Sequence, residues 1–555
     1  MAGKQNELVF LPLGGVGEIG MNFALYGFGP AKSREWIVVD CGVTFPGPDL
    51  PGADLVLPDI SFIEGEVERL RGIVITHAHE DHYGALLALW PKLKVPVWAT
   101  PFTAGLLEAK RGSEDGNVKI PVTIYNAGDT FQVGPFFIEA VAVTHSIPEP
   151  VSLAITSPAG TVIHTGDWKI DSAPAIGGKT DENRFRELGA KGVLALICDS
   201  TNAMRDGISP SEQEVGASLK NLIEEAPGRV AITTFSSNVG RIRSIALAAR
   251  DAGRRVLVLG RSLKRVIDVA DDLGYMQGIP EFLAEEDFQY VPREEVVILC
   301  TGSQGESRAA LAKLARNELN NVSLAPGDTV IYSSRVIPGN EKPIIDIKNQ
   351  LIEQGVRIIE DSDALVHVSG HPRRNELKQM YEWVKPQISV PVHGEAAHLV
   401  AHGSLAATIG VPQVAQVRNG DLLRLAPGPA EILTKVEAGR IFKDGYLIGT
   451  FDKVGIRDRK KLSFVGHIAV NVVLDDRHDL AGDPDLVSIG VPDEDANGRD
   501  MDDLLLDAAI GAIESIPRVR RKNLDLVAES ARRAIRAAAR DAWGKKPVVT
   551  VFVTR

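Results

Sequence analysis

Short apolar runs separated by small polar residues recur along the whole chain. Runs of this length that are rich in Val and Ile are typical of β-strands. From residue 193 to residue 332 each run is followed by a small-residue loop and an amphipathic stretch, which predicts a parallel α/β sheet. The other predicted strands lie at 8–13, 21–26, 36–42, 95–100, 136–143, 161–168, 467–474, 485–491 and 548–553, and two C-terminal helices at 501–516 and 524–543.

One of these runs ends in a cluster of histidines. The apolar residues 72–75 lead into His77, His79, Asp81 and His82. Alternate residues of an extended segment point to the same side, so His77 and His79 can bind one cation. Asp81 and His82, at the start of a predicted helix, can face a second cation. Imidazole and carboxylate are the ligands of hydrolytic zinc or manganese sites, and the absence of thiolate argues against a closed structural site.

Further candidate ligands follow other predicted strands. His145 comes after 136–143, Asp167 lies at the end of 161–168, and His393 follows the run at 388–392. We therefore expect a dinuclear site in which Asp167 bridges the two ions. The expected ligands are His77, His79 and His145 for one ion, and Asp81, His82 and His393 for the other.

Three other features near these strands have simpler interpretations. Gly15, Gly17 and Gly20 match a dinucleotide-binding fingerprint, but a strand is predicted after them where that motif requires a helix, so we reject a nucleotide cofactor. Asp40, at a strand end, either orients a metal ligand or caps a turn. His164 is interpreted as a strand residue or as a support for a ligand.

The loops of the parallel α/β region are rich in Ser, Gly and Asn. Such loops at helix starts expose backbone N–H groups that suit phosphate, although helix capping is the alternative. Two loops also carry Arg261 and Arg335, which favours an anion-lined cleft. His367 and Ser369 share one face of an extended run, and both can contact a phosphate oxygen. The loop candidates for phosphate binding are Ser236, Ser237, Asn238 and Arg261.

Composition limits the class of protein. A length of 555 residues with 44% hydrophobic and 24% charged residues indicates a globular protein of several domains. A polar N-terminus without a run of about 18 apolar residues predicts neither a signal peptide nor a membrane span. Cys41, Cys198 and Cys300 end apolar runs, which predicts buried reduced thiols and a cytoplasmic location. A net charge of -12 argues against a broad nucleic-acid surface but permits a local basic groove.

The order of these residues, Asp40, the histidine cluster, His145 and Asp167, resembles the metallo-β-lactamase superfamily. The whole chain is similar to the bacterial ribonuclease J family of the β-CASP subgroup, in the segments 14–22, 199–202, 301–306, 338–341, 367–371 and 391–395. The resemblance implies an α/β fold: a metallo-β-lactamase αββα sandwich with an inserted β-CASP parallel α/β domain and a small α/β C-terminal domain. The implied boundaries are 1–205 and 367–430 for the lactamase domain, 206–366 for β-CASP, 431–462 for a linker and 463–555 for the C-terminal domain.

The resemblance also implies an activity. It predicts a metal-dependent ribonuclease with 5′-to-3′ exonuclease and endonuclease activity, in rRNA processing and mRNA decay. Asp199 and His371 would act with Asp81 and Asp167 as catalytic residues. The implied phosphate clamp is His367, Val368, Ser369, Gly370 and His371. We expect a hydroxide held between two divalent ions, Zn²⁺ with Mn²⁺ as the alternative, to attack the phosphodiester.

The partners follow from this activity. We expect single-stranded RNA with a 5′-monophosphate, no membrane, a homodimer or homotetramer, and a place in an RNA-decay assembly. The basic residues of the C-terminal domain either contact RNA or form a solvated helix face paired with acids. By resemblance, this domain supports subunit association. The basic residues of this domain are Arg518, Arg520, Arg521, Lys522, Arg532, Arg533, Arg536 and Arg540.

Three other functions remain open at this point. A β-CASP nuclease acting on DNA would use the same ligands. A lactamase-fold hydrolase of small esters or thioesters would leave the inserted domain unexplained. A non-catalytic RNA-binding subunit would not need the full ligand set.

Overall fold

A computed structural model describes residues 5–113, 118–337 and 339–555. The chain divides into two compact units, residues 1–44 with 56–440, and residues 45–55 with 441–555. Pro338, at the start of the 338–341 segment, lies outside the described residues.

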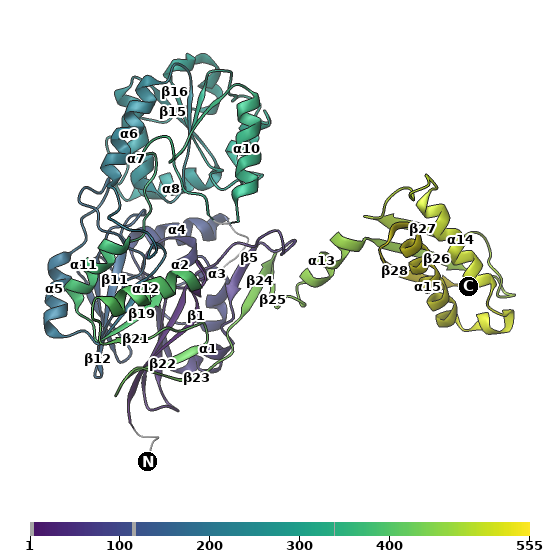
Figure 1. Ribbon diagram of the computed structural model, residues 1–555, viewed down its shortest axis with the longest axis horizontal. Helices are drawn as coiled ribbons and strands as arrows, with labels where there is room; N and C mark the ends of the chain where they lie inside the picture. The colour runs from purple at the N-terminus through teal and green to yellow at the C-terminus, as the bar shows by residue number, and fades with distance from the viewer. Residues whose placement is uncertain (1–4, 114–117, 338) are drawn as a thin grey trace. The chain divides into compact units, whose positions relative to one another are not determined.

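Two sheets packed face to face form the first part of the larger unit (Figure 1). Within the described residues, the first sheet has the strand order β23-β22-β1-β3-β4-β6-β7-β8 and the second β21-β19-β13-β12-β11-β10-β9. The strands of the first sheet are β1 (Glu7–Gly14), β3 (Phe23–Gly29), β4 (Glu35–Val39), β6 (Leu70–Val74), β7 (Val97–Ala99), β8 (Val122–Ile124), β22 (Asp421–Ala426) and β23 (Glu431–Lys435). Those of the second are β9 (Thr130–Val133), β10 (Phe136–Ala142), β11 (Val151–Ser157), β12 (Gly160–His164), β13 (Ala195–Asp199), β19 (Ile388–Val392) and β21 (Gln413–Val414).

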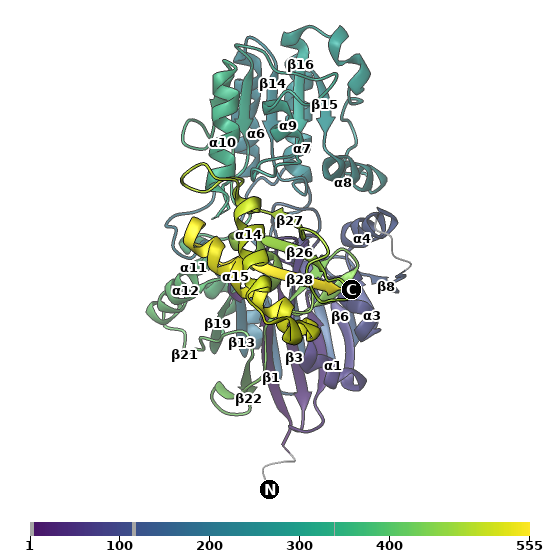
Figure 2. The same cartoon turned by 90° about the vertical axis from the view of Figure 1, so that its right-hand side faces the viewer.

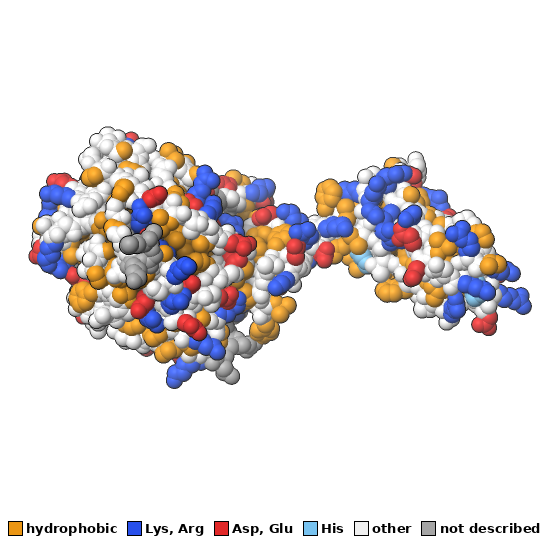
Figure 3. Space-filling model, turned by 90° about the horizontal axis from the view of Figure 1, so that it is seen from below, with side chains coloured by type: hydrophobic (Ala, Val, Ile, Leu, Met, Phe, Trp, Pro, Cys, Tyr) orange, Lys and Arg blue, Asp and Glu red, His pale blue; other side chains and the backbone are white. Residues whose placement is uncertain are grey.

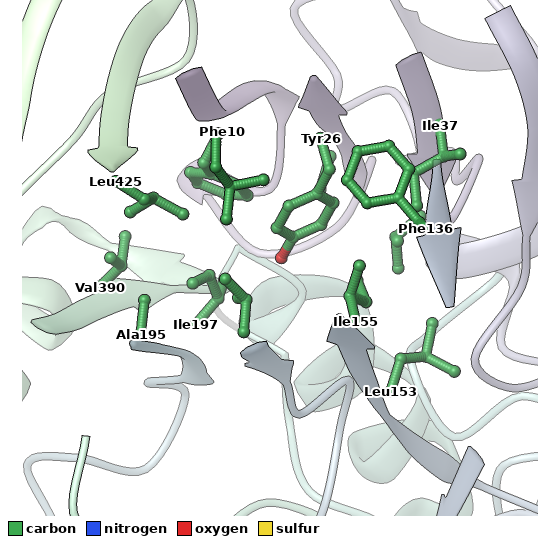
Figure 4. Packing of buried hydrophobic residues seen from close by; sticks show 14 of the residues in the cluster. Phe10, Tyr26, Ile37, Phe136, Leu153, Ile155, Ala195, Ile197, Val390 and Leu425 are labelled. Atoms are coloured by element: carbon green, nitrogen blue, oxygen red, sulfur yellow. The ribbon is translucent and has the colours of Figure 1, made fainter. Parts of the chain in front are cut away.

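The main apolar core fills the space between the two sheets. Figure 4 shows Phe10 and Tyr26 of the first sheet facing Ile155 and Ile197 of the second. Each of these side chains is at least 99% buried, because alternate residues of each strand point inward. This packing fixes the strand ends, and therefore the residues that follow them.

Helices cover the outer faces of the sandwich. The second sheet is covered by α5 (Glu182–Lys191), α11 (Arg374–Val384) and α12 (Ala396–Thr408), whose apolar residues join a separate core. On the first sheet, Phe62 of α1 (Ser61–Gly65) packs edge-on against Trp36 with ring centroids 5.4 Å apart. Further elements of this part are β5 (Leu55–Pro58), α2 (Glu80–Tyr83), α3 (Leu86–Leu93) and α4 (Pro101–Ser113). The predicted αββα sandwich is confirmed.

A separate α/β domain is inserted in the chain between β13 and β19, which are parallel neighbours in the second sheet. Its five strands, in the order β15-β16-β14-β17-β18, are all parallel within the described residues (Figures 1 and 2). They are β14 (Val230–Thr233), β15 (Arg255–Leu259), β16 (Val296–Cys300), β17 (Thr329–Tyr332) and β18 (Arg357–Ile359). The helices are α6 (Glu212–Glu225), α7 (Val239–Asp251), α8 (Arg261–Asp272), α9 (Ala310–Ala315) and α10 (Glu341–Glu353). The predicted parallel sheet is confirmed.

The segment 431–462 differs from the predicted linker. It contains β23, β24 (Arg440–Asp444), β25 (Leu447–Gly449) and most of α13 (Ile456–Val465). The residues Pro427, Gly428 and Pro429 instead form the turn between β22 and β23, which pair antiparallel. Turn-forming residues therefore mark a hairpin here and not the start of an extended connection.

The C-terminal part forms a small α/β unit of its own. Strands β26 (His467–Val473), β27 (Asp485–Ile489) and β28 (Val548–Thr554) form a sheet whose inner face packs on α14 (Met501–Glu514) and α15 (Leu524–Trp543). Figure 3 shows basic and acidic side chains beside one another on this unit. Arg518 and Arg521 pair with Asp479, Arg532 and Arg533 with Glu529, and Arg540 with Asp541. These pairs favour the solvated helix face over an RNA surface.

Candidate metal centre

Strand ends at one edge of the sandwich bring the predicted ligands together. Each ligand follows a buried strand or lies in the short helix α2, so its backbone is held by the sheets. His77 and His79 follow β6, Asp81 and His82 lie in α2, and His145, Asp167 and His393 follow β10, β12 and β19.

His79 is at the centre of the first group. Its Nδ1 lies 3.1 Å from Nε2 of His77 and 3.0 Å from Nε2 of His145. Ligand atoms of these three residues and Asp167 all lie within 4.8 Å of one another. Three imidazoles and one carboxylate thus converge on a space that suits one cation.

Asp167 connects this group to a second one. Its Oδ2 lies 3.7 Å from Nε2 of His77 and 3.3 Å from Nε2 of His82. His393 Nε2 is 3.2 Å from Oδ2 of Asp81. Ligand atoms of Asp81, His82, Asp167 and His393 also lie within 4.8 Å of one another. The carboxylate of Asp167 is therefore shared by both groups, as expected for a bridge.

Each candidate histidine ligand has one ring nitrogen that faces away from the centre, and that nitrogen contacts a neighbouring group. Such contacts fix the orientation of a metal ligand and leave its other nitrogen for the ion. His82 Nδ1 bonds to Asp40 at 2.7 Å, His145 Nδ1 to the Gly370 carbonyl at 2.7 Å, His393 Nδ1 to Thr201 at 2.9 Å, His77 Nδ1 to Thr76 at 3.0 Å and His79 Nε2 to Ser237 at 3.1 Å.

The two groups differ in their electrostatics. Burial lowers the pKa of His77 and His145 well below the ordinary value and that of His79 to about 4, so these imidazoles are neutral, as metal ligands must be. Burial also opposes the charged form of His82 and His393, but nearby carboxylates, Asp167 first, outweigh it and raise the pKa of both. A cation entering the second group must displace these protons.

The residues present fit a divalent cation. Asp167 Oδ1 is buried and has no hydrogen-bond partner among the described residues, although a buried carboxylate oxygen is normally paired. Nitrogen and carboxylate oxygen surround it without thiolate, the donor set of hydrolytic zinc and manganese sites. A cation would satisfy this oxygen.

Two backbone positions support this geometry. Asp40 and His393 have positive φ values of 64° and 51°, which non-glycine residues rarely adopt. The His393 backbone N–H donates to the Gly15 carbonyl at 2.8 Å, and β2 (Val16–Gly17) pairs with β20 (Gly394–Glu395) beside it. The glycine loop at 14–20 thus holds a candidate ligand. The element that follows this loop is the strand β3 and not the helix that a dinucleotide-binding motif requires.

Asp199 and His371 form a pair next to the two groups. His371 Nδ1 lies 2.7 Å from Oδ2 of Asp199 and 3.9 Å from Oδ2 of Asp167. Burial disfavours the charged imidazole, but Asp199 and Asp167 outweigh this effect and raise the pKa of His371. His371 can therefore carry a proton at the edge of the centre.

The predicted phosphate-binding residues differ in their exposure and in the contacts that their side chains already make. Ser369 is bonded to Asn202 at 2.8 Å, and Asn238 caps α7 by accepting a bond from Arg241 N at 2.9 Å. The Arg261 side chain, exposed in the first turn of α8, makes no hydrogen bond or ion pair with any described residue. The Ser237 hydroxyl and the Gly370 carbonyl hold metal-ligand candidates, the Val368 side chain is buried, and Ser236 is partly exposed. Direct binding of phosphate by these residues stays a prediction.

Several residues that support the ligands were not predicted in that role, although Asn22 and Thr201 lie in the segments 14–22 and 199–202 that carry the family resemblance. Thr76, Asn22 and Thr201 contact the ligands through hydroxyl or amide groups. Asp40 accepts bonds from Thr76 as well as contacting His82, so the structure favours the orienting role over turn capping. His164 bonds to Tyr26 within the core, as a strand histidine would.

Family models match four parts of the chain. Residues 35–182 match the beta-lactamase superfamily domain, and residues 356–415 match the Zn-dependent metallo-hydrolase RNA specificity domain. Residues 227–351 match the ribonuclease J beta-CASP domain, and residues 454–555 match the ribonuclease J C-terminal domain. The chain is 63% identical over 552 residues to ribonuclease J of Sinorhizobium meliloti, covering 100% of this chain and 98% of that protein. The chain belongs to the ribonuclease J family.

Other family members are more distant but span most of the chain. Ribonuclease J 1 of Streptococcus pyogenes is 37% identical over 97% of this chain and 95% of its own length. Ribonuclease J of Mycolicibacterium smegmatis is 40% identical over 83% of this chain and 82% of its own length. A crystal structure of a protein of unknown function from Enterococcus faecalis, 17% identical, covers 75% of this chain and all of its own with a TM-score of 0.53, which shows the fold alone. The protein is a hydrolase, a ribonuclease with metallo-hydrolase domains, and RNA is its substrate.

The contact between Asp40 and His82 gives a first testable prediction. Asp40→Ala should weaken binding of metal by about 10- to 100-fold, because His82 loses the group that orients it. Titration of the metal-free protein with Zn²⁺ or Mn²⁺ measures the effect. Asp251→Ala, which removes a surface carboxylate paired with Arg250, is the matched control. Unchanged affinity in Asp40→Ala would show that Asp40 only shapes the turn.

Proposed function

We propose that this ribonuclease J family member binds two divalent cations, Zn²⁺ or Mn²⁺, and uses both of them to hydrolyse the phosphodiester bonds of RNA. The shared position of the Asp167 carboxylate carries this proposal, since its Oδ2 lies within 3.7 Å of ligand atoms from both groups. When bound, two such ions supply an activated water and neutralise charge on the phosphate. The proposed ligands are His77, His79, Asp81, His82, His145, Asp167 and His393.

The residues next to the centre have separate roles in this proposal. Asp199 accepts a bond from His371 Nδ1, which leaves Nε2 of His371 to face the substrate. Because nearby carboxylates raise the pKa of His371, it holds a proton that it can donate to the departing 3′-oxygen. The expected products carry a 5′-monophosphate and a 3′-hydroxyl.

A site for the RNA backbone adjoins this pair. His367 Nδ1 is buried without a hydrogen-bond partner among the described residues, and burial, then Arg241 and Arg335, lower the pKa of His367. A neutral imidazole beside several cations suits an anionic ligand such as phosphate. Single-stranded RNA would then be held by backbone contacts and stacking rather than by base-edge readout.

We further propose 5′-to-3′ exonuclease and endonuclease activity and a preference for RNA with a 5′-monophosphate. Small-residue loops beside the site, including residues 236–238, offer hydroxyl and backbone donors for a terminal phosphate.

The setting of the enzyme is also a proposal. The three cysteines are free and buried, which suits a reducing cytoplasm. Among the described residues no helix has the length and apolar character needed to span a bilayer. Val487, Ile489 and Phe552 are exposed on the sheet of the C-terminal unit, which supports association as a homodimer or homotetramer. A place in an RNA-decay assembly rests on the family alone.

A comparison of substrate ends tests the proposed function. Labelled RNA with a 5′-monophosphate, 5′-triphosphate or 5′-hydroxyl is incubated with the Zn²⁺ or Mn²⁺ enzyme, beside matching DNA and a thioester. We expect RNA to be cleaved fastest when it carries a 5′-monophosphate, with release of mononucleotides from that end. Turnover of the thioester alone, or faster loss of DNA than of RNA, would contradict the proposal.

A further inference from the structure

Three arginines, Arg205, Arg335 and Arg373, form a group beside the proposed cleavage site, called here the arginine cluster. They come from three segments that are distant in sequence: the loop after β13, the loop after β17 and the residue before α11. Among the described residues none of the three makes an ion pair, although their positions border the site. A group of cations without an ion-pair contact at this place requires an explanation.

Asn202 connects the cluster to the site. Its amide nitrogen donates to Ser369 Oγ at 2.8 Å and to the His371 carbonyl at 3.1 Å. Its amide oxygen accepts a bond from the Arg335 guanidinium at 3.2 Å. Arg335 is therefore separated from the proposed proton donor by one side chain.

The backbone fixes the other two arginines nearby. The N–H of Arg205 donates to the Asn202 carbonyl at 2.9 Å, and the Arg205 carbonyl accepts a bond from Arg374 N at 2.9 Å. Arg373 precedes Arg374 and is the N-cap residue of α11. The Nε of Arg373 is buried without a hydrogen-bond partner among the described residues. The cluster is thus held by the same loop that supports His371.

The charges of the cluster act on one another. Burial and then Arg373 lower the pKa of Arg205, while burial and then Arg205 lower that of Arg335. Asp361 is the acid that opposes this effect in both cases. Other arginines nearby are neutralised: Arg374 pairs with Asp206 at 3.2 Å and Arg241 with Glu212 at 2.8 Å. An anionic ligand would relieve the repulsion within the cluster.

Exposed apolar side chains flank the arginines in the same loops. Met204 is 58% exposed next to Arg205, and Ile337 is 47% exposed two residues after Arg335. Large exposed apolar groups among cations suit a ligand that has both phosphates and flat apolar faces. Single-stranded RNA has both.

We propose that the arginine cluster binds internal phosphates of an RNA strand beyond the scissile bond, and so favours long single strands over dinucleotides. This inference rests on the proposed function. A dinucleotide presents its scissile phosphate to the metal centre but offers no internal phosphate to the cluster. The guanidiniums would therefore discriminate by chain length and not by base sequence.

The test compares 5′-monophosphorylated RNA of two and sixteen nucleotides, using the full-length enzyme loaded with metal. In Arg205→Gln and Arg335→Gln, the ratio of kcat/KM for the long substrate to kcat/KM for the dinucleotide should fall about tenfold each. The dependence of log KM on log salt for the long substrate should weaken by roughly 0.7 per arginine. Arg316→Gln, which removes a surface arginine paired with Glu318, should change neither quantity.

Each outcome decides a different question. An equal loss on both substrates would overturn the inference, because the arginines would then serve the cleaved bond or the 5′ end. An unchanged ratio with an unchanged salt dependence would also overturn it. If the unmodified enzyme cleaves no RNA with either metal, the proposed function fails, and that result is separate from a failure of the cluster. Thermal unfolding of each variant shows whether it is folded.

Discussion

Asp167→Asn is expected to lower kcat/KM for RNA by about 10³-fold or more. The substitution keeps the shape of the side chain but removes the charge that lies between the two candidate groups. Asp167 Oδ2 is 3.6 Å from Nε2 of His145 and 3.3 Å from Nε2 of His82, so both groups lose a ligand. Cleavage of end-labelled RNA and metal content by elemental mass spectrometry measure the two effects together.

Variants of the second group make this prediction more specific. Asp81→Ala and His82→Ala should also abolish cleavage but retain one ion, since His77, His79 and His145 remain. Asp251→Asn, a surface change on α7, should keep both ions and full activity. Near-normal RNA cleavage by the Asp167, Asp81 and His82 variants would contradict the site.

Much of the fold could be predicted because the signals are local. The alternation of strands and helices from β14 to α10 and the elements of the C-terminal unit follow from apolar periodicity. The structure of segment 431–462 was harder to predict, because its strands are short and partly exposed. In addition, residues 427–429 have a composition that occurs both in linkers and in hairpin turns. Its pairing with β22 depends on the rest of the sheet.

The site shows a similar division. His77, His79, Asp81 and His82 stand out because four metal-binding residues occur within six positions. The Ser237 hydroxyl was expected to bind phosphate, but it lies 3.1 Å from His79, a contact between residues 158 positions apart. Arg205 and Arg373 gave no signal, since single arginines and adjacent arginine pairs are common on any surface. Such roles depend on tertiary contacts that a single sequence does not contain.

His371→Ala is expected to reduce kcat by about 10²- to 10⁴-fold while both ions are retained. The structure places His371 Nδ1 on Asp199 at 2.7 Å, and its pKa is raised by that carboxylate and by Asp167, against the effect of burial. The loss should therefore come from the proton that reaches the departing 3′-oxygen. Single-turnover cleavage of RNA by the metal-loaded variant measures it.

A substrate with a better leaving group separates proton donation from simple phosphate binding. RNA in which sulfur replaces the 3′-bridging oxygen at the scissile bond needs little protonation to depart. We expect His371→Ala to cleave this RNA nearly as fast as the unmodified enzyme does. An equal defect on both substrates would show that His371 binds the phosphate and does not donate the proton.

Anomalous diffraction from crystals grown with Zn²⁺, and separately with Mn²⁺, tests the central claim most directly. We expect two metal peaks in each subunit, one among His77, His79, His145 and Asp167 and the other among Asp81, His82, Asp167 and His393. A single peak, or peaks that leave Asp167 without a metal contact, would contradict it.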